Sequence, residues 1–371
     1  MTPIGAECLP VSVTVEGDLD LVPTVLEQLE FDIDFSGLLR SSEEGVATLC
    51  VEVSGGLDGT SITARAEADG EELLRKTYSS SSDDVYPLVH ALADDLVFCL
   101  TGEQGIASTR IAFVSRVGET YRLVAGSLDP RSPVLLIEDE QVITTPAWSP
   151  DGARIAFTSF RSDNADLYVY SIGQRSARKV SSLPGLNATP AWSPDGTMLA
   201  LTVSEGSDPN ICLLDLATGG LQKLTTRSSI ETSPSFSPSG LQLVFTSDRL
   251  GAPQLFVMDN TGAAVRRFNY AHAYCDSPSW SPTGDRIAYA ARTSSGSIHV
   301  FVADADGSNV RQVTFEGYLN EDPSWSPTGR HLVFSSNRGG ERSIYVLELN
   351  DLLLRELPGP GECYCPTWSP L

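Results

Sequence analysis

The sequence of 371 residues offers little of what catalytic sites are made from. Its four histidines, His90, His272, His299 and His331, are dispersed, with no His-Glu-x-x-His motif and no pair four residues apart, so we expect packed or surface residues rather than ligands. It also lacks a Gly-x-Ser-x-Gly elbow, a phosphate-binding P-loop and a dinucleotide fingerprint. The sequence therefore predicts no enzyme, and no catalytic residue is assigned.

Positive charge is scarce as well. The chain has 25 basic and 48 acidic residues, a net charge of −23, and no run of Lys and Arg. Such a surface repels phosphate backbones, so nucleic acid and anionic membranes are poor candidate partners. A partner or a cation that carries positive charge is better matched.

Long apolar runs are missing too. None reaches the ~18–20 residues that span a bilayer, so no membrane insertion is expected. The first residues, Met1 to Leu9, lack the basic and apolar regions of a secretory signal. Two interpretations stay open: a cytoplasmic protein, or a chain from which a signal has been removed.

The seven cysteines are an odd number, so at least one thiol has no partner within the chain. Cys363-x-Cys365 is spaced too closely for a zinc-type Cys-x-x-Cys. Scattered buried thiols and surface disulfides in an oxidising compartment both remain possible.

What the sequence does contain is a repeat. Pro-x-Trp-Ser-Pro, or its Phe variant, occurs six times, with the aromatic residue at Trp148, Trp192, Phe236, Trp280, Trp325 and Trp368. The steps between them are 44, 44, 44, 45 and 43 residues. This period is typical of one propeller blade per repeat.

Short β-branched and aromatic runs fill each repeat, as strands do. The first unit begins at its second strand, Arg110-Ile-Ala-Phe-Val-Ser115, whereas the last Trp-Ser-Pro has no strand after it. The terminal strand around Trp368 is therefore expected to complete the first blade and close the ring. Within the repeat, Trp fills the space between blades, Pro ends the inner strand, and Asp-Gly or Thr-Gly makes the turn.

Residues 8–104 lack the repeat. Strand patterns at 11–15, 46–53, 60–68 and 73–78 alternate with helical patterns at 21–29 and 83–100, the second capped by Ser82 or Asp83 and ended by Gly102. We predict an α+β amino-terminal domain, residues 1–104, followed by an all-β six-bladed β-propeller, residues 105–371, closed by the carboxyl-terminal strand.

Candidate binding residues follow from propeller geometry. The loops between strands two and three lie on the same rim as those between strand four and the next strand one, around the channel mouth. The loops that lead from strand four into the next strand one carry these residues before each Pro-x-Trp: Asn187, Glu231, Asp276, Asn320, Glu321 and Asp322. The loops between strands two and three carry Asp163, Asn164, Asp248, Arg249, Asn337 and Arg338. This rim could hold a polar peptide or a cation such as calcium, or its residues could be solvated turn positions.

Three stretches resemble the TolB family of the Tol–Pal cell-envelope system. They are the Trp-Ser-Pro-Asp-Gly repeats with Phe245 to Asp259, the junction from Leu100 to Val114, and the ending Pro-x-Trp-Ser-Pro-Leu. The resemblance covers both domains. Phe236 departs from it by replacing one Trp, and this is expected to alter only packing.

The resemblance implies a non-enzymatic periplasmic scaffold. Its propeller would bind the peptidoglycan-associated lipoprotein Pal, with calcium in the channel, and support outer-membrane integrity and cell division. Contact with TolA is implied too, but the short amino-terminal end does not match the family's TolA-contacting segment. The alternative is a propeller that binds a small ligand or glycan, or an accessory subunit of an envelope enzyme.

Overall fold

The computed structural model describes residues 8–56, 59–128, 133–162, 164–204, 206 and 208–371. The chain divides into two compact units. The first comprises the residues up to Thr109 together with Ser127, Leu128 and Glu348–Leu353, and the second comprises the remaining residues from Arg110 on. The boundary expected after residue 104 falls between the last helix of the first unit and the first propeller strand, and it stays a prediction.

The amino-terminal unit is built on a mixed sheet of five strands in the order β2-β1-β3-β4-β5. The strands are β1 (Leu9–Gly17), β2 (Leu39–Ser41), β3 (Ala47–Gly56), β4 (Gly59–Ala68) and β5 (Glu71–Ser80). β1 runs parallel to both β2 and β3, and the other pairs are antiparallel. Parallel neighbours need a crossover, and the helix α1 (Val22–Phe35) provides it between β1 and the next strands.

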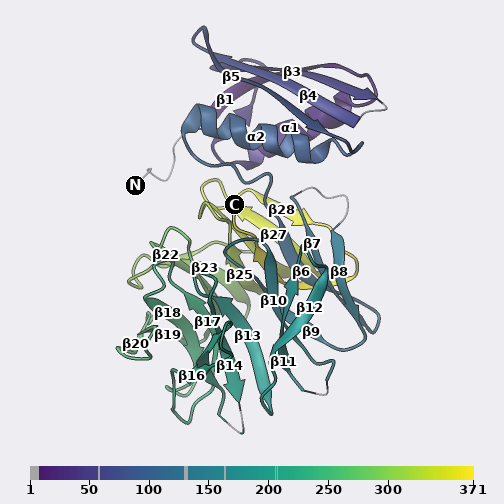
Figure 1. Ribbon diagram of the computed structural model, residues 1–371. Helices are drawn as coiled ribbons and strands as arrows, with labels where there is room; N and C mark the ends of the chain where they lie inside the picture. Colours follow the sequence, from purple (N-terminus) through teal and green to yellow (C-terminus); the bar gives the residue numbers. More distant parts are fainter. Residues whose placement is uncertain (1–7, 57–58, 129–132, 163, 205, 207) are drawn as a thin grey trace. The chain divides into compact units, whose positions relative to one another are not determined.

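The helices α1 and α2 (Tyr86–Thr101) bury one apolar stripe each in a single core with the sheet (Figure 1). The residues expected to share one face of this helix are all buried: Val85, which directly precedes α2, and Leu88, Val89, Leu92, Leu96 and Val97 within it. Gly102, with a φ of 74°, ends the helix as expected by donating its N–H to Phe98.

The expected start of α2 was wrong. The helix begins at Tyr86 rather than Asp83, and neither Ser82 nor Asp83 caps it. Pro87 explains the shift, because proline lacks the N–H that an interior helical position must donate and is tolerated only in the first turn.

The second unit contains six four-stranded antiparallel sheets, one per blade. Blades two to four are β9 (Ile143–Trp148), β10 (Arg154–Ser159), β11 (Asp166–Ser171), β12 (Ser176–Ser181); β13 (Leu186–Trp192), β14 (Met198–Ser204), β15 (Asn210–Asp215), β16 (Leu221–Lys223); and β17 (Glu231–Phe236), β18 (Gln242–Ser247), β19 (Gln254–Asp259), β20 (Arg266–Arg267). Blades five and six are β21 (Cys275–Trp280), β22 (Arg286–Arg292), β23 (Ile298–Asp304), β24 (Arg311–Gln312); and β25 (Asn320–Trp325), β26 (His331–Gly339), β27 (Glu341–Glu348), β28 (Leu354–Leu357).

The first blade confirms that the carboxyl-terminal strand closes the ring. It combines β6 (Ile111–Val117), β7 (Thr120–Gly126) and β8 (Val134–Asp139) with β29 (Glu362–Trp368) in the order β29-β6-β7-β8. Trp368 pairs with Ile111, so the yellow end of the chain in Figure 1 lies beside the strand that opens the propeller. The innermost strand of this blade therefore comes from the opposite end of the sequence, and the ring has no open edge at its seam.

Candidate functional site at the propeller rim

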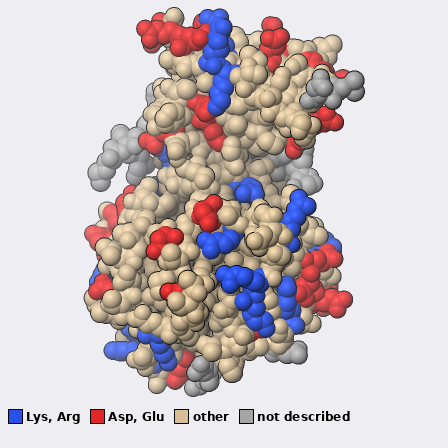
Figure 2. All heavy atoms as spheres, viewed as in Figure 1, with Lys and Arg blue, Asp and Glu red and all other residues tan. Residues whose placement is uncertain are grey.

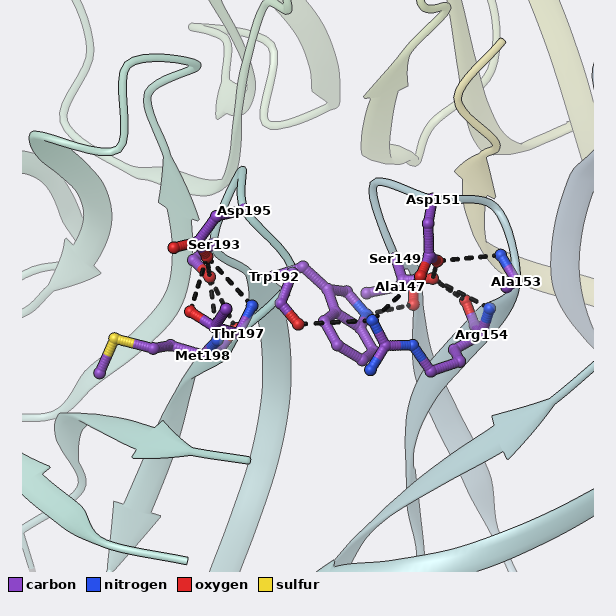
Figure 3. A network of polar contacts seen from close by, with 11 residues as sticks. Ala147, Ser149, Asp151, Ala153, Arg154, Trp192, Ser193, Asp195, Thr197 and Met198 are labelled. Carbon is purple, nitrogen blue, oxygen red and sulfur yellow. Dashed lines mark hydrogen bonds and ion pairs between the residues drawn. The ribbon is translucent and has the colours of Figure 1, made fainter. Parts of the chain in front are cut away.

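The Trp-Ser-Pro repeats join neighbouring blades. Ser149 donates its hydroxyl to the carboxylate of Asp151 and accepts the N–H of Arg154 at 2.9 Å, which closes the turn (Figure 3). The Arg154 guanidinium lies 4.6 Å from the ring centroid of Trp192 in the next blade, and the Trp192 indole N–H donates to Ala147 at 3.0 Å (Figure 3). The expectation that the repeat is structural agrees with these contacts.

The same arrangement recurs around the ring. A basic residue opening strand two stacks on the next tryptophan: Arg110 on Trp148 at 5.1 Å and Arg286 on Trp325 at 5.0 Å. At the seam, His331 lies against Trp368 with the ring centroids 6.1 Å apart. These repeated side chains therefore serve blade packing, so a candidate binding site is sought at the rim.

The inner strands of all six blades line a channel with a cavity of about 230 Å³ at one mouth. Six residues, each directly before the first Pro of its repeat, stand around this mouth: Thr145, Thr189, Ser233, Ser277, Asp322 and Cys365. Their φ angles all lie between 47° and 55°. Left-handed backbone is unfavourable for such residues and costs roughly 1–3 kcal/mol each, a strain that proteins often keep at functional sites.

A bulge in each inner strand accompanies this conformation. The pairing with strand two shifts register at that point, for example between Asp276 and Ser279 and between Glu321 and Ser324. The bulge changes which side chains face the channel, so simple alternation along the strand fails here.

The residue three positions before each of these prolines is buried. Asn187 and Asn320, two predicted binding residues, are fully buried. The Asn187 carbonyl oxygen accepts the Ser181 hydroxyl at 2.7 Å and its amide donates to Leu183 at 2.7 Å, whereas Asn320 accepts the Ser336 hydroxyl at 2.9 Å. Both amides hold the loop before the strand and offer no surface to a partner.

Glu231 occupies the same position and is also fully buried. Its carboxylate forms an ion pair with Arg249, another predicted binding residue, whose side chain is only 9% exposed. Ser229 donates to the same oxygen at 3.1 Å. The pair is part of the internal structure of the rim.

Arginines under the rim repeat in three blades. Each stacks on two aromatic side chains: Arg161 on Phe157 and Tyr168 at 6.0 and 4.8 Å, Arg249 on Phe245 and Phe256 at 5.3 and 4.6 Å, and Arg338 on Phe334 and Tyr345 at 5.5 and 4.7 Å. Burial lowers the pKa of Arg338 from its ordinary value. These side chains support the loops from below.

Beside these arginines, a polar side chain of the loop between strands two and three connects that loop to the one that leads into strand one. In three blades it accepts a backbone N–H from the loop that leads into strand one: Asp248 from Ile230 at 2.8 Å, Asn337 from Tyr318 at 3.0 Å, and Asn164 from Gly185 at 3.0 Å. Asp163, the adjacent predicted residue, lies outside the described residues. The bridges fix the loops, so Asp248 and Asn337 are already occupied within the chain.

Three predicted carboxylates do gather beside the mouth. Asp276 accepts the Thr246 hydroxyl at 2.9 Å, Asp322 accepts the Ser277 hydroxyl at 3.2 Å, and all three side chains, Glu321 included, are half-buried. The charge of Asp276 contributes to raising the pKa values of both Glu321 and Asp322. Among the predicted set, these three carboxyl groups lie beside the channel mouth, and contact of the predicted residues with a partner stays a prediction.

Desolvation and like charge govern this cluster. Burial raises the pKa of Glu321, and the charge of Asp322 raises it further against the opposing effect of Arg342, 2.8 Å away. Burial likewise raises the pKa of Asp322. Nearby, burial and the charge of Asp276 raise the pKa of the Tyr274 phenol to about 12. Three carboxyl groups therefore stand beside the mouth, and Arg342 pairs with one of them, Glu321.

Among the described residues, no group of three or more His, Cys, Asp or Glu side chains is arranged to hold a metal ion. The three carboxylates therefore provide no recognisable calcium cage in this part of the chain. Calcium in the channel stays a prediction.

The rim also exposes apolar residues that sequence reasoning missed. Five large side chains stand in the rim loops of three consecutive blades and form what we call the apolar arc: Ile230 at 51%, Leu250 at 61%, Tyr270 at 79%, Phe315 at 65% and Tyr318 at 60% exposure. The sequence did carry a signal for this surface, because these large apolar residues stand in loop segments that contain Ser, Gly and Asn. Elsewhere at this rim, within the described residues, Val117 at 40% is the comparable case.

The net charge does not form one continuous field on the face drawn in Figure 2. Acidic and basic groups lie close together there, and uncharged side chains cover most of the surface. A partner that meets such a face need not be strongly basic.

The family model of the TolB beta propeller domain matches residues 98–371, well over half of the chain. The chain belongs to the TolB β-propeller family. A crystal structure of TolB from Acinetobacter baumannii superposes with a TM-score of 0.89 over 99% of this chain and 98% of that one, at 25% sequence identity. The expected TolB resemblance and the expected fold class are both confirmed.

Curated relatives agree with this family. The Tol-Pal system protein TolB of Legionella pneumophila strain Philadelphia 1 is 30% identical over 171 residues, which cover 40% of this chain and 41% of that protein. That of Anaeromyxobacter dehalogenans is 36% identical over 101 residues. The chain thus spans less than half of the length of these TolB relatives. The printed names of these relatives give a system rather than a reaction.

The TolB structure of Agrobacterium tumefaciens, labelled putative, shows the fold alone, with a TM-score of 0.56 over 71% of this chain at 21% identity. In the described part of the chain, neither helix is long and apolar enough to cross a membrane.

Proposed function

We propose that the chain is a periplasmic, non-enzymatic docking protein of the Tol–Pal system, and that its propeller binds the peptidoglycan-associated lipoprotein Pal over the channel mouth. Membership of the TolB family, with a structural match along almost the whole chain, is the observation that carries the proposal. Support of outer-membrane integrity and of cell division belongs to the same proposal.

The rim suits a protein partner better than a small ligand. Pockets for small molecules usually enclose about 300–1,000 Å³. The cavity at the mouth, about 230 Å³, is lined by all six blades and opens onto exposed side chains. A broad, fixed rim around a shallow centre favours recognition of a surface.

Binding to TolA through the amino-terminal unit is also part of the proposal. The resemblance supports it, but the first seven residues lie outside the described residues, so no contact surface is assigned there. Calcium in the channel is likewise part of the proposal, and it is tested by repeating the binding measurement with and without a chelator.

The test is a calorimetric titration of the full chain with the soluble domain of Pal from the same organism. Saturable one-to-one binding is expected, with a negative heat-capacity change because apolar surface is buried. Glycan fragments of the envelope serve as the comparison. Binding of glycans without binding of Pal would support the alternative of a glycan-binding propeller and contradict the proposal.

A further inference from the structure

The apolar arc is unusual for a surface that meets only water. Ile230, Leu250, Tyr270, Phe315 and Tyr318 are each more than half exposed, and all belong to loops at one end of three neighbouring blades. Single exposed apolar residues are common, but a group on one rim marks an interaction site.

These residues are also held in place. The N–H of Ile230 and that of Tyr318 donate to Asp248 and Asn337, at 2.8 and 3.0 Å. Beneath them, Arg249 is paired with Glu231. The buried polar groups thus fix the backbone that carries the arc, and a partner that binds there loses little free energy in ordering it.

The composition of the arc fits protein recognition. Tyrosine and arginine are enriched at the energetic centres of interfaces. Tyr270, the most exposed member, has the Arg267 guanidinium 4.2 Å from its ring centroid, and Arg267 donates to Gln254 at 2.5 Å. An aromatic ring held in this way presents apolar area together with a polar edge.

Charge indicates what the partner brings. The chain runs from the arc directly into the mouth: Ile230 is three residues before Ser233, and Tyr318 is four residues before Asp322. Asp276, Glu321 and Asp322 place three carboxyl groups on this side of the mouth, where Arg342 pairs with Glu321 at 2.8 Å. A basic side chain of the partner would complement these groups, whereas an acidic one would be repelled.

We propose that the apolar arc is the surface on which the protein partner docks, and that the partner carries an apolar patch flanked by a Lys or Arg that points at the carboxylates of the mouth. The inference rests on the proposed function and deepens it, since it moves the main contact from the polar rim residues to the apolar ones. The polar residues Asn187, Glu231, Asn320, Asp248 and Asn337 then act as its scaffold.

The test uses the full chain, the soluble domain of Pal and single substitutions of exposed residues. Tyr318→Ala and Leu250→Ala are each expected to weaken binding and so raise the dissociation constant about tenfold or more, as substitutions at interface centres do. Leu241→Ala is the matched control, because Leu241 is 65% exposed but lies in the turn between β17 and β18. Its dissociation constant should change less than about twofold.

A second arm tests the charge. Asp322→Asn keeps a residue that tolerates left-handed backbone while removing the carboxylate. It is expected to weaken binding several-fold and to reduce the loss of affinity between about 50 and 500 mM salt. Circular dichroism should show unchanged melting for every variant. Tyr270→Ala replaces an arc variant that fails to fold, and Asp276→Asn replaces Asp322→Asn if that variant fails to fold.

The outcomes separate the two proposals. If the unaltered chain does not bind Pal, the proposed function fails and this inference fails with it. If the unaltered chain binds and the arc variants bind equally well, only the inference is overturned. An Asp322→Asn variant with undiminished affinity and salt dependence would overturn the assignment of a basic partner group.

Discussion

The serine of each Trp-Ser-Pro repeat shows how single polar groups are used in this chain. Ser193 donates to Asp195 at 2.6 Å, and Asp195 accepts the N–H of Thr197 at 3.0 Å, just as Ser149 and Asp151 do one blade earlier. These bonds lower the pKa of both aspartates, the hydroxyl of the serine being the largest cause. A lowered pKa makes the turn dependent on pH.

The expected consequence is a loss of stability in acid. The folded-state pKa of each aspartate lies below the ordinary value of 3.8, so the stabilisation is complete above that pH and is lost as pH falls through the folded pKa. Between about pH 6 and pH 2.5, the melting temperature should fall more steeply for the unaltered chain than for Asp151→Asn/Asp195→Asn. Parallel curves would contradict this, and Glu119→Gln, at a side chain 95% exposed, is the control.

A buried charge gives a second prediction at this scale. Glu231→Gln should lower the free energy of unfolding by on the order of 3 kcal/mol, because it leaves Arg249 buried without its ion pair. Urea unfolding measures the difference. A loss below about 1 kcal/mol would show that the pair contributes no more than a surface one.

The residue scale is also where sequence reasoning was weakest. Asn187, Glu231 and Asn320 were expected at the rim as binding residues, or alternatively as solvated turn positions, yet all three are buried. The reason is physical: whether a polar side chain at a strand start faces water depends on the loops that fold over it, and these come from distant parts of the chain. The bulge beside Asp322 then shifts the alternation that a strand pattern assumes.

At the scale of elements, the inner strands carry the architecture. Period, turn residues and the unpaired last repeat were enough to predict six blades and the seam, because each is a local signal repeated along the chain. Trp368 pairs with Ile111 as that reading required. Helix ends and rim contacts were less predictable, since single prolines and tertiary hydrogen bonds decide them.

Removing β29 tests the seam. Without Glu362–Leu371, β6 would present an open, largely apolar edge, because it would lose its pairing with the closing strand. The shortened chain is expected to lose its cooperative thermal transition and to associate in size-exclusion chromatography. Deletion of Leu371 alone, 61% exposed, should change neither property. A shortened chain that melts as sharply and at the same temperature would show that closure is unnecessary.

At the scale of the whole molecule, the propeller is a closed ring whose Trp-Ser-Pro repeats pack neighbouring blades together, and we propose that its rim binds a protein partner. Strained residues surround the mouth, acidic groups collect on one side of it, and the apolar arc stands beside them. Membership of the TolB β-propeller family supports the proposal that this surface works in the Tol–Pal system.

Hydrogen–deuterium exchange of the full chain, with and without the soluble domain of Pal, tests this account most directly. Binding on the rim should slow exchange in peptides that cover residues 229–233, 248–251, 268–277 and 315–322, since these segments carry the arc and the acidic side of the mouth. The outer strands β12, β16 and β20 should exchange as before. Protection confined to those outer strands or to the sheet of the amino-terminal unit would contradict the account.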